Sequence, residues 1–103
     1  MLAIGICGVG GRMGQRLAAL VADSEDLRLV ACTEAPGHPL VGQDAGAACG
    51  SGPLGVAVTA GTQALAAASV VLDFTRPEAT LQAARACAAA GTAMVVGTTG
   101  FTA

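Results

Sequence analysis

The stretch that decides the fold is LAIGICGVGGRMG, residues 2–14. Residues 2–7 form a short apolar run, which is typical of a buried parallel strand. Three glycines then follow at G-x-x-G-x-x-G spacing, and residues 12–23 carry apolar side chains at helical spacing. A glycine turn between a strand and a helix lets a pyrophosphate approach the backbone and meet free N–H groups at the helix start. The opening of the chain therefore predicts a dinucleotide-binding turn.

Apolar runs and alanine-rich segments alternate along the rest of the chain. We expect strands at 2–7, 27–33, 56–58, 69–74 and 93–96, and helices at 12–23, at 61–68 and from Pro77 to about Ala90. Residues 35–53 contain three Pro and five Gly and predict a long loop. Alternating strands and helices predict the α/β class. We expect a Rossmann-type, doubly wound parallel sheet between two layers of helices, which is a three-layer αβα arrangement. We expect residues 1–103 to form one domain.

Two of these helices carry side-chain predictions. Residues 12–23 are expected to bury one apolar stripe, made by Met13, Leu17, Leu20 and Val21. Before the helix from Pro77, Thr75 and Glu78 have the spacing of a capping box. Thr75 is therefore a candidate N-cap.

Composition excludes several classes of protein. The net charge is −2, the five Arg are scattered, and there is no Lys, so we expect neither a nucleic-acid partner nor a membrane surface. No apolar run reaches the roughly 18 residues of a membrane span, and we expect no signal peptide and a cytoplasmic location. The four Cys include no C-x-x-C pair. We interpret them as small core residues and expect no metal site.

Glu34 is the first candidate ligand-binding side chain outside the turn. It lies twenty positions after Gly14, at the end of the second predicted strand. A carboxylate there can accept hydrogen bonds from the adenosine ribose, whereas its charge would repel a 2′-phosphate. Ala35 offers no cation to offset that repulsion. We therefore expect NAD(H) to be preferred, with NADP(H) possible; the alternative is a solvated Glu at a strand end.

Two further segments follow predicted strands, at residues 73–77 and 97–100. In an open α/β sheet, ligands bind outside the carboxyl ends of the strands, so both segments are expected at the same edge as the glycine turn. Simpler interpretations stay open: Asp73 as a cap or turn residue and residues 97–100 as a plain turn. His38, the single His, is either a solvated loop residue or a contact to the cofactor adenine.

Other classes of protein with a glycine turn require residues that can be checked in this sequence. A P-loop requires Lys, and a short-chain dehydrogenase requires a catalytic Tyr and Lys, and the chain has neither residue type. An S-adenosylmethionine site, as in a methyltransferase, shares the turn and the acidic residue and stays open. A stand-alone NAD-binding or redox-sensing module is a further alternative.

Three motifs occur in order: VGGRMG at 9–14, VLDFTRPE at 71–78 and VVGTTGF at 95–101. Together they resemble the nucleotide-binding half of the dihydrodipicolinate reductases, and the resemblance covers essentially the whole chain. It implies an oxidoreductase that uses NADH or NADPH to reduce the dihydrodipicolinate precursor to tetrahydrodipicolinate, on the route to diaminopimelate and lysine. Many members of that family carry a basic residue after the ribose-binding acid, and Ala35 departs from this pattern.

Pattern and resemblance together imply a set of cofactor-binding residues. These are Gly8, Val9, Gly10, Gly11, Arg12 and Met13 at the pyrophosphate, Glu34 at the ribose, Phe74, Thr75 and Arg76 along the cofactor, and Gly97, Thr98 and Thr99 beside the nicotinamide. The resemblance places the substrate-binding His-His pair and Lys in a second domain, which we expect this chain to lack. We therefore predict cofactor binding without turnover and no catalytic residue here. The family tetramer is implied to be built by that second domain, and we expect this chain to self-associate differently.

Overall fold

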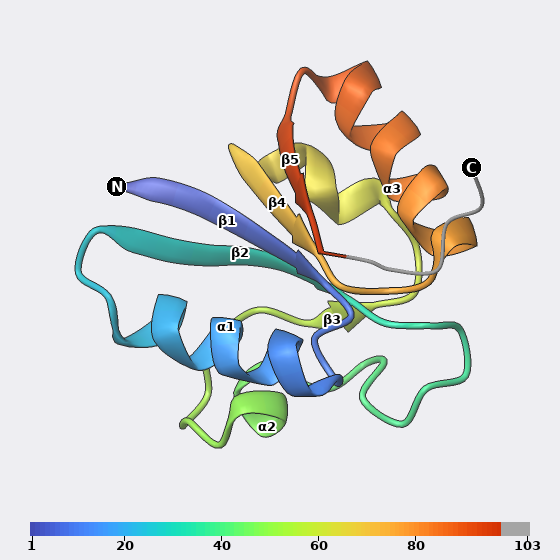
Figure 1. Cartoon of the computed structure of the whole chain (residues 1–103). Helices are drawn as coiled ribbons and strands as arrows, with labels where there is room; N and C mark the ends of the chain where they lie inside the picture. The colour runs from blue at the N-terminus through green and yellow to red at the C-terminus, as the bar shows by residue number, and fades with distance from the viewer. Residues whose placement is uncertain (98–103) are drawn as a thin grey trace.

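The computed structural model describes residues 1–97, and within them one parallel sheet carries helices on both faces (Figure 1). The strands are β1 (Leu2–Cys7), β2 (Leu27–Thr33), β3 (Val58–Thr59), β4 (Val70–Asp73) and β5 (Ala93–Val96). The helices are α1 (Arg12–Asp23), α2 (Gly46–Cys49), α3 (Pro77–Ala90) and a 3₁₀ helix, η1 (Gln63–Ala67). The predicted α/β class and the three-layer Rossmann-type architecture are confirmed.

The strand order is β3-β2-β1-β4-β5, and every pairing between these strands is parallel. The chain therefore builds outward from β1 to β3 and then crosses to the other side of β1 to form β4 and β5. Figure 1 shows α1 and α2 on one face of the sheet, and η1 and α3 on the other. This arrangement makes the carboxyl edge between β1 and β4 the point where the winding reverses, which is where such sheets bind ligands.

The core has one cluster on each face of the sheet. The α1 side buries Ile4, Ile6, Val9, Ala18, Val21, Leu29, Cys32, Ala45 and Val58. The α3 side buries Cys7, Ala31, Leu65, Ala68, Val71, Ala83 and Cys87. Most of these side chains are small or branched, so the helices can lie close to the sheet.

The stripe predicted for α1 is partly wrong. The helix buries Gly14, Ala18 and Val21, whereas Met13 and Leu20 are 47% and 67% exposed. Gly14 lies so close to the glycine turn that an added Cβ would be 2.0 Å from the Gly8 carbonyl oxygen. Val21 and the partly buried Leu17 do belong to the inner face, as predicted. The close approach at Gly14 turns this face toward the core, so that Met13 and Leu20 lie outside it.

The predicted loop at 35–53 contains unexpected structure. It includes the short helix α2, and Ala45 is completely buried in the α1-side cluster. The short strand expected at 56–58 is found at Val58–Thr59, and the helix expected at 61–68 is the 3₁₀ helix η1. None of the helices described between residues 1 and 97 combines the length and apolar character that a membrane crossing requires.

The interpretation of the cysteines as core residues is confirmed for Cys7, Cys32 and Cys87, which are buried and unpaired. Burial raises the pKa of the Cys32 thiol to about 12. Burial likewise raises the pKa of Cys7 to about 11, although a hydrogen bond with Thr33 opposes the shift. Both side chains are neutral thiols at physiological pH and act as small apolar residues.

Candidate functional site

A crevice of about 630 Å³ opens at the carboxyl edge of the sheet, at the point where the winding reverses. Its volume falls in the range typical of small-molecule sites. It is lined by Cys7, Gly8, Gly10, Gly11, Thr33, Glu34, Ala35, Pro36, His38, Ala60, Gly61, Thr62, Phe74, Thr75, Arg76, Glu78, Ala79, Gln82 and Ala83. The structure thus brings together the glycine turn, Glu34 and the segment after β4, which are far apart in sequence.

The glycine turn packs against the carboxyl ends of β2 and β4. Gly8 has φ +83°, and its N–H donates to the Thr33 carbonyl at 3.0 Å. A Cβ at Gly8 would lie 2.8 Å from the Phe74 carbonyl oxygen, so both the conformation and the space at this position require glycine. The turn closes with the Gly11 N–H donating to the Gly8 carbonyl at 3.1 Å. The result is a compact turn whose backbone faces the crevice.

The start of α1 lies directly above this turn. Gly11 is the N-cap residue, and no side chain caps it. The first N–H groups of a helix have no intrahelical carbonyl and carry the positive end of the helix dipole. The opening of α1 can therefore receive an anionic group such as a pyrophosphate.

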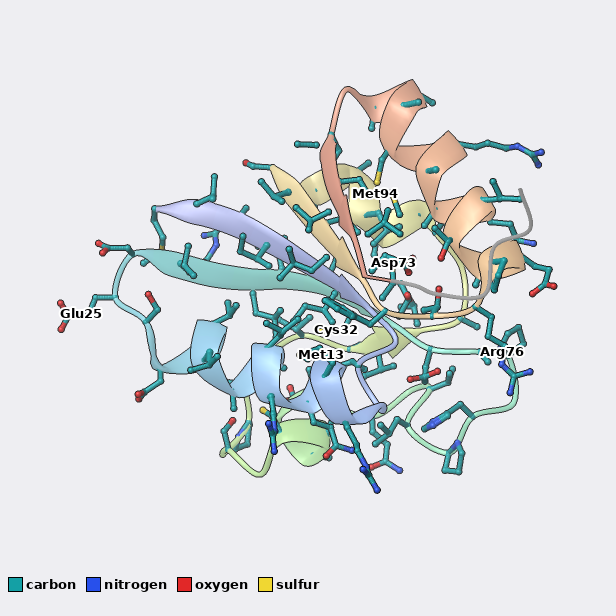
Figure 2. The ribbon with its side chains drawn as sticks, in the orientation of Figure 1. Met13, Glu25, Cys32, Asp73, Arg76 and Met94 are labelled. Carbon is teal, nitrogen blue, oxygen red and sulfur yellow. The ribbon has the colours of Figure 1, made fainter. Side chains whose placement is uncertain are left out.

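The other three predicted residues of the turn differ in position. Val9 is completely buried, and its N–H donates to the Thr33 carbonyl at 3.3 Å, so a direct contact between Val9 and a ligand is not supported. Core packing accounts for Val9, because its side chain belongs to the α1-side cluster. Arg12 and Met13 are exposed in the first turn of α1 and do not line the crevice. Figure 2 shows Met13 on the ribbon of α1.

Glu34, at the end of β2, reaches back to the turn. Its Oε2 accepts from the Gly10 N–H at 2.8 Å, and its Oε1 accepts from the Ala35 N–H at 2.9 Å. A carboxylate has about four acceptor sites, so each oxygen can still accept a hydrogen bond from a ligand hydroxyl. A Cβ at Gly10 would lie 2.9 Å from Oε2, so the glycine is needed for this contact.

Asp73, Thr75 and Thr80 form a buried polar cluster at the end of β4. Asp73 is completely buried, and its Oδ1 accepts from the Thr75 hydroxyl at 2.7 Å. The Thr80 hydroxyl, on the inner face of α3, donates to the other carboxylate oxygen. Figure 2 shows Asp73 between the sheet and α3. The cluster fixes where the chain leaves β4 and so positions the residues that line this side of the crevice.

The capping box predicted for Thr75 and Glu78 is wrong. The N-cap of α3 is Arg76, and no side chain caps it. The Thr75 hydroxyl instead bonds to the buried carboxylate of Asp73. A buried charge is costly without donors, and a bond to it is stronger than one to a backbone N–H that water can also reach.

Phe74 and Arg76 line the crevice, and Figure 2 places Arg76 at the carboxyl edge of the sheet. At Gly97, glycine is required by the Phe74 ring rather than by a ligand, because a Cβ there would lie 2.0 Å from that ring. Gly97 thus makes room for the ring that lines the site. The predictions for Thr98 and Thr99 lie outside the described residues.

Sequence reasoning missed the far wall of the crevice. Residues 60–62, which follow β3, and one face of α3 with Ala79, Gln82 and Ala83 also line it. The first group could have been expected, since it follows a strand, but two-residue β3 has little pattern of its own. The second depends on where α3 packs, which local sequence does not specify.

A doubly wound parallel sheet with a glycine turn, a bare helix start and a carboxylate at the end of β2 defines the class of Rossmann-type nucleotide-binding domains. The profile of the family described as "Dihydrodipicolinate reductase, N-terminus" matches residues 2–103. The chain belongs to this family, as the three motifs indicated. The methyltransferase alternative is set aside by this match.

Curated relatives agree with the family. The chain is 44% identical over 103 residues to the 4-hydroxy-tetrahydrodipicolinate reductase of Citrifermentans bemidjiense. The aligned region covers 99% of this chain and 39% of that protein. It is 50% identical over 98 residues to the reductase of the same name from Bordetella pertussis, covering 95% of this chain and 36% of the relative. The chain thus spans about two fifths of the length of these relatives.

Two solved structures are similar in fold. Dipicolinate-bound dihydrodipicolinate reductase from Paenisporosarcina sp. TG-14 superposes with a TM-score of 0.71 and 27% identity, over 99% of this chain and 39% of that one. Aspartate semialdehyde dehydrogenase with NADP from Candida albicans gives a TM-score of 0.73 at 16% identity, over 95% of this chain and 30% of that one. The second likeness concerns the fold alone.

Proposed function

We propose that this chain binds NAD(P)H in the crevice and prefers NADH, as the nucleotide-binding part of a dihydrodipicolinate reductase. The observation that carries the proposal is the contact between Glu34 and Gly10, at 2.8 Å. It places a carboxylate at the rim of the glycine turn, where the ribose of a dinucleotide lies when its pyrophosphate meets a helix start.

In this arrangement, the N–H groups at the start of α1 bind the pyrophosphate, and Glu34 accepts from the ribose hydroxyls. Phe74, Thr75 and Arg76 border the cofactor on the β4 side of the crevice. Gly97, Thr98 and Thr99 are proposed to continue that border. The bound reduced nicotinamide supplies a hydride; the residues described here bind and orient it.

The negative charge of Glu34 supports the preference for NADH. A 2′-phosphate at the same ribose would face this carboxylate, and Ala35 beside it carries no charge. Like charges at hydrogen-bond distance disfavour binding, whereas the two hydroxyls of an unphosphorylated ribose can both donate to Glu34.

Calorimetric titration of the chain with NADH and with NADPH tests the proposal. We expect NADH to bind about tenfold more tightly, a total difference of about 1.4 kcal/mol in binding free energy. In Glu34→Gln, which keeps the size and one acceptor oxygen, NADH affinity should fall and the difference between the cofactors should shrink. Tighter binding of NADPH than NADH by the natural chain would refute the preference, and binding of neither would refute the site.

The reductase activity itself is proposed for the longer protein. The chain contains no Lys and one His, and hydride transfer needs donor and acceptor held about 3–3.5 Å apart. We therefore propose that the chain binds NADH without reducing the dihydrodipicolinate precursor; measurable turnover by the chain would contradict this. A reducing, cytoplasmic location is part of the proposal and suits the free thiols of Cys7, Cys32 and Cys87.

A further inference from the structure

The loop after β2 folds back so that His38 lies over the glycine turn. A Cβ at Gly10 would lie 2.9 Å from both Cε1 and Nε2 of His38, and 2.9 Å from Oε2 of Glu34. The imidazole and the carboxylate therefore flank the same backbone position, and both line the crevice. Of the two interpretations that the sequence left open for His38, this position argues against a residue that merely faces solvent.

Two consecutive turns hold His38 in place. The His38 N–H donates to the Ala35 carbonyl at 3.0 Å, across Pro36 and Gly37. Proline followed by a glycine with φ +85° is the pattern of a type II turn. The His38 carbonyl then accepts from the Val41 N–H at 3.0 Å, across a segment that begins with a second proline, Pro39. The backbone at His38 is thus held on both sides.

A third contact orients the ring. The Leu40 N–H donates to Nδ1 of His38 at 3.1 Å, so Nδ1 carries no proton. In the neutral imidazole the proton is then on Nε2, the nitrogen that lies over Gly10. The loop therefore presents a fixed N–H donor to the crevice, beside the Glu34 carboxylate.

No other side chain between residues 34 and 37 can take the place of this donor. Glu34, Ala35, Pro36 and Gly37 have no side chain that can donate a hydrogen bond at neutral pH. A ribose hydroxyl can be served by the acceptor Glu34, but the oxygens of a 2′-phosphate can only be served by donors. We propose that Nε2–H of His38 donates to the 2′-phosphate of NADPH, and that His38 thereby determines how far this NADH-preferring site admits NADPH. The inference rests on the proposed function and deepens it.

Replacement of His38 by asparagine removes the Nε2–H donor while keeping the hydrogen bond that supports the turn. In His38→Asn, the side-chain oxygen occupies the place of Nδ1 and can still accept from the Leu40 N–H, while the rest of the ring, with Nε2, is removed. We expect the dissociation constant of NADPH to rise about tenfold, as for a lost hydrogen bond to a charged group, and that of NADH to change less than about twofold. Both constants are measured by calorimetry on the whole chain.

His38→Gln is the companion variant, because its longer amide can again place an N–H near the position of Nε2. It should recover part of the NADPH affinity that His38→Asn loses. Equal losses for both cofactors, or no loss for either, would overturn the inference while leaving the proposed function intact. If the natural chain bound neither cofactor, the proposed function would fail first, and the inference with it.

Discussion

At the scale of single residues, the site depends on places where side chains are absent. Gly8, Gly10, Gly14 and Gly97 each lie where a Cβ would meet another atom at 2.9 Å or less. At Gly10 and Gly97 the neighbouring atoms belong to the side chains of Glu34, His38 and Phe74, which line the crevice. At Gly8 and Gly14 they belong to the backbone. The glycines therefore bring the turn, α1 and the wall of the crevice within contact distance of each other.

Gly14→Ala tests this close approach. Alanine is favoured over glycine in a helix by about 1 kcal/mol. Here the Cβ would lie 2.0 Å from the Gly8 carbonyl oxygen, a backbone atom that cannot swing aside. The clash should exceed the gain in helix propensity, so we expect a net loss of about 2 kcal/mol in the free energy of unfolding, measured by urea denaturation.

The matched control is Gly52→Ala, since no atom lies within 4 Å of the Cβ that it would add. Its free energy of unfolding should change by less than about 0.5 kcal/mol. Equal stability of the Gly14 and Gly52 variants would show that the packing of α1 on the turn is looser than described.

At the scale of elements, the segment between β2 and β3 is held together by Asp44. Its Oδ1 accepts from the N–H groups of Gly46 and Leu54, and its Oδ2 accepts from that of Gly55, each at 2.8 Å. These contacts close a loop around α2, whose preceding residue Ala45 is completely buried. The carboxylate adds to backbone hydrogen bonds that join residues 42–45 to residues 56–58 at the base of the same loop.

The Asp44 contacts predict a dependence of stability on pH. The backbone N–H groups, Leu54 first and then Gly46, lower the pKa of Asp44 below its ordinary value. A group whose pKa is lower in the folded state stabilises the fold above its unfolded pKa, which is about 3.9, and loses that effect as the pH falls through the folded value. The melting temperature of the natural chain should therefore fall more steeply below about pH 4 than that of Asp44→Asn.

Thermal unfolding of both chains between pH 7 and pH 2.5 measures this difference. At pH 7, Asp44→Asn should melt several degrees lower, since its amide nitrogen cannot accept from the Gly55 N–H. The two melting curves should approach each other in acid. Parallel dependence on pH in the two chains would show that Asp44 does not contribute through its charge.

At the scale of the whole molecule, the described sheet has an uncovered apolar face. α3 covers one face of β4 and β5, where Met94 packs against the α3-side cluster. On the other face, Val95 lies beside Leu72 and is 54% exposed, and no described helix covers β5 on that side (Figure 1). β5 is also an edge strand of the described sheet. Exposed edges and apolar faces favour pairing with another chain.

We therefore predict that the chain self-associates through β5. Light scattering should show an apparent mass that rises with concentration. Val95→Lys should reduce this rise, because it places a charge on the apolar face. Leu20→Lys is the control, since Leu20 is also exposed but lies on α1, away from β5. A natural chain that stays monomeric at high concentration would contradict the prediction.

Local patterns in the sequence were sufficient for the elements that carry their own signal. The bounds predicted for the strand at 2–7, the helix at 12–23 and the strand at 27–33 agree with those of β1, α1 and β2. Each combines an apolar period with a clear boundary residue. The position of Glu34 beside the turn followed from these patterns, the fold class from the alternation of strands and helices along the chain, and the family from the three motifs at 9–14, 71–78 and 95–101.

Only the tertiary structure decided the rest, because it depends on which distant groups meet. Thr75 bonds to Asp73 rather than capping α3, since burial makes the carboxylate the more demanding partner. α1 places Gly14 on its inner face because the turn beneath that position leaves no room for a Cβ. His38 lies over Gly10 through two turns and one bond to its ring, contacts that no periodicity in the chain encodes.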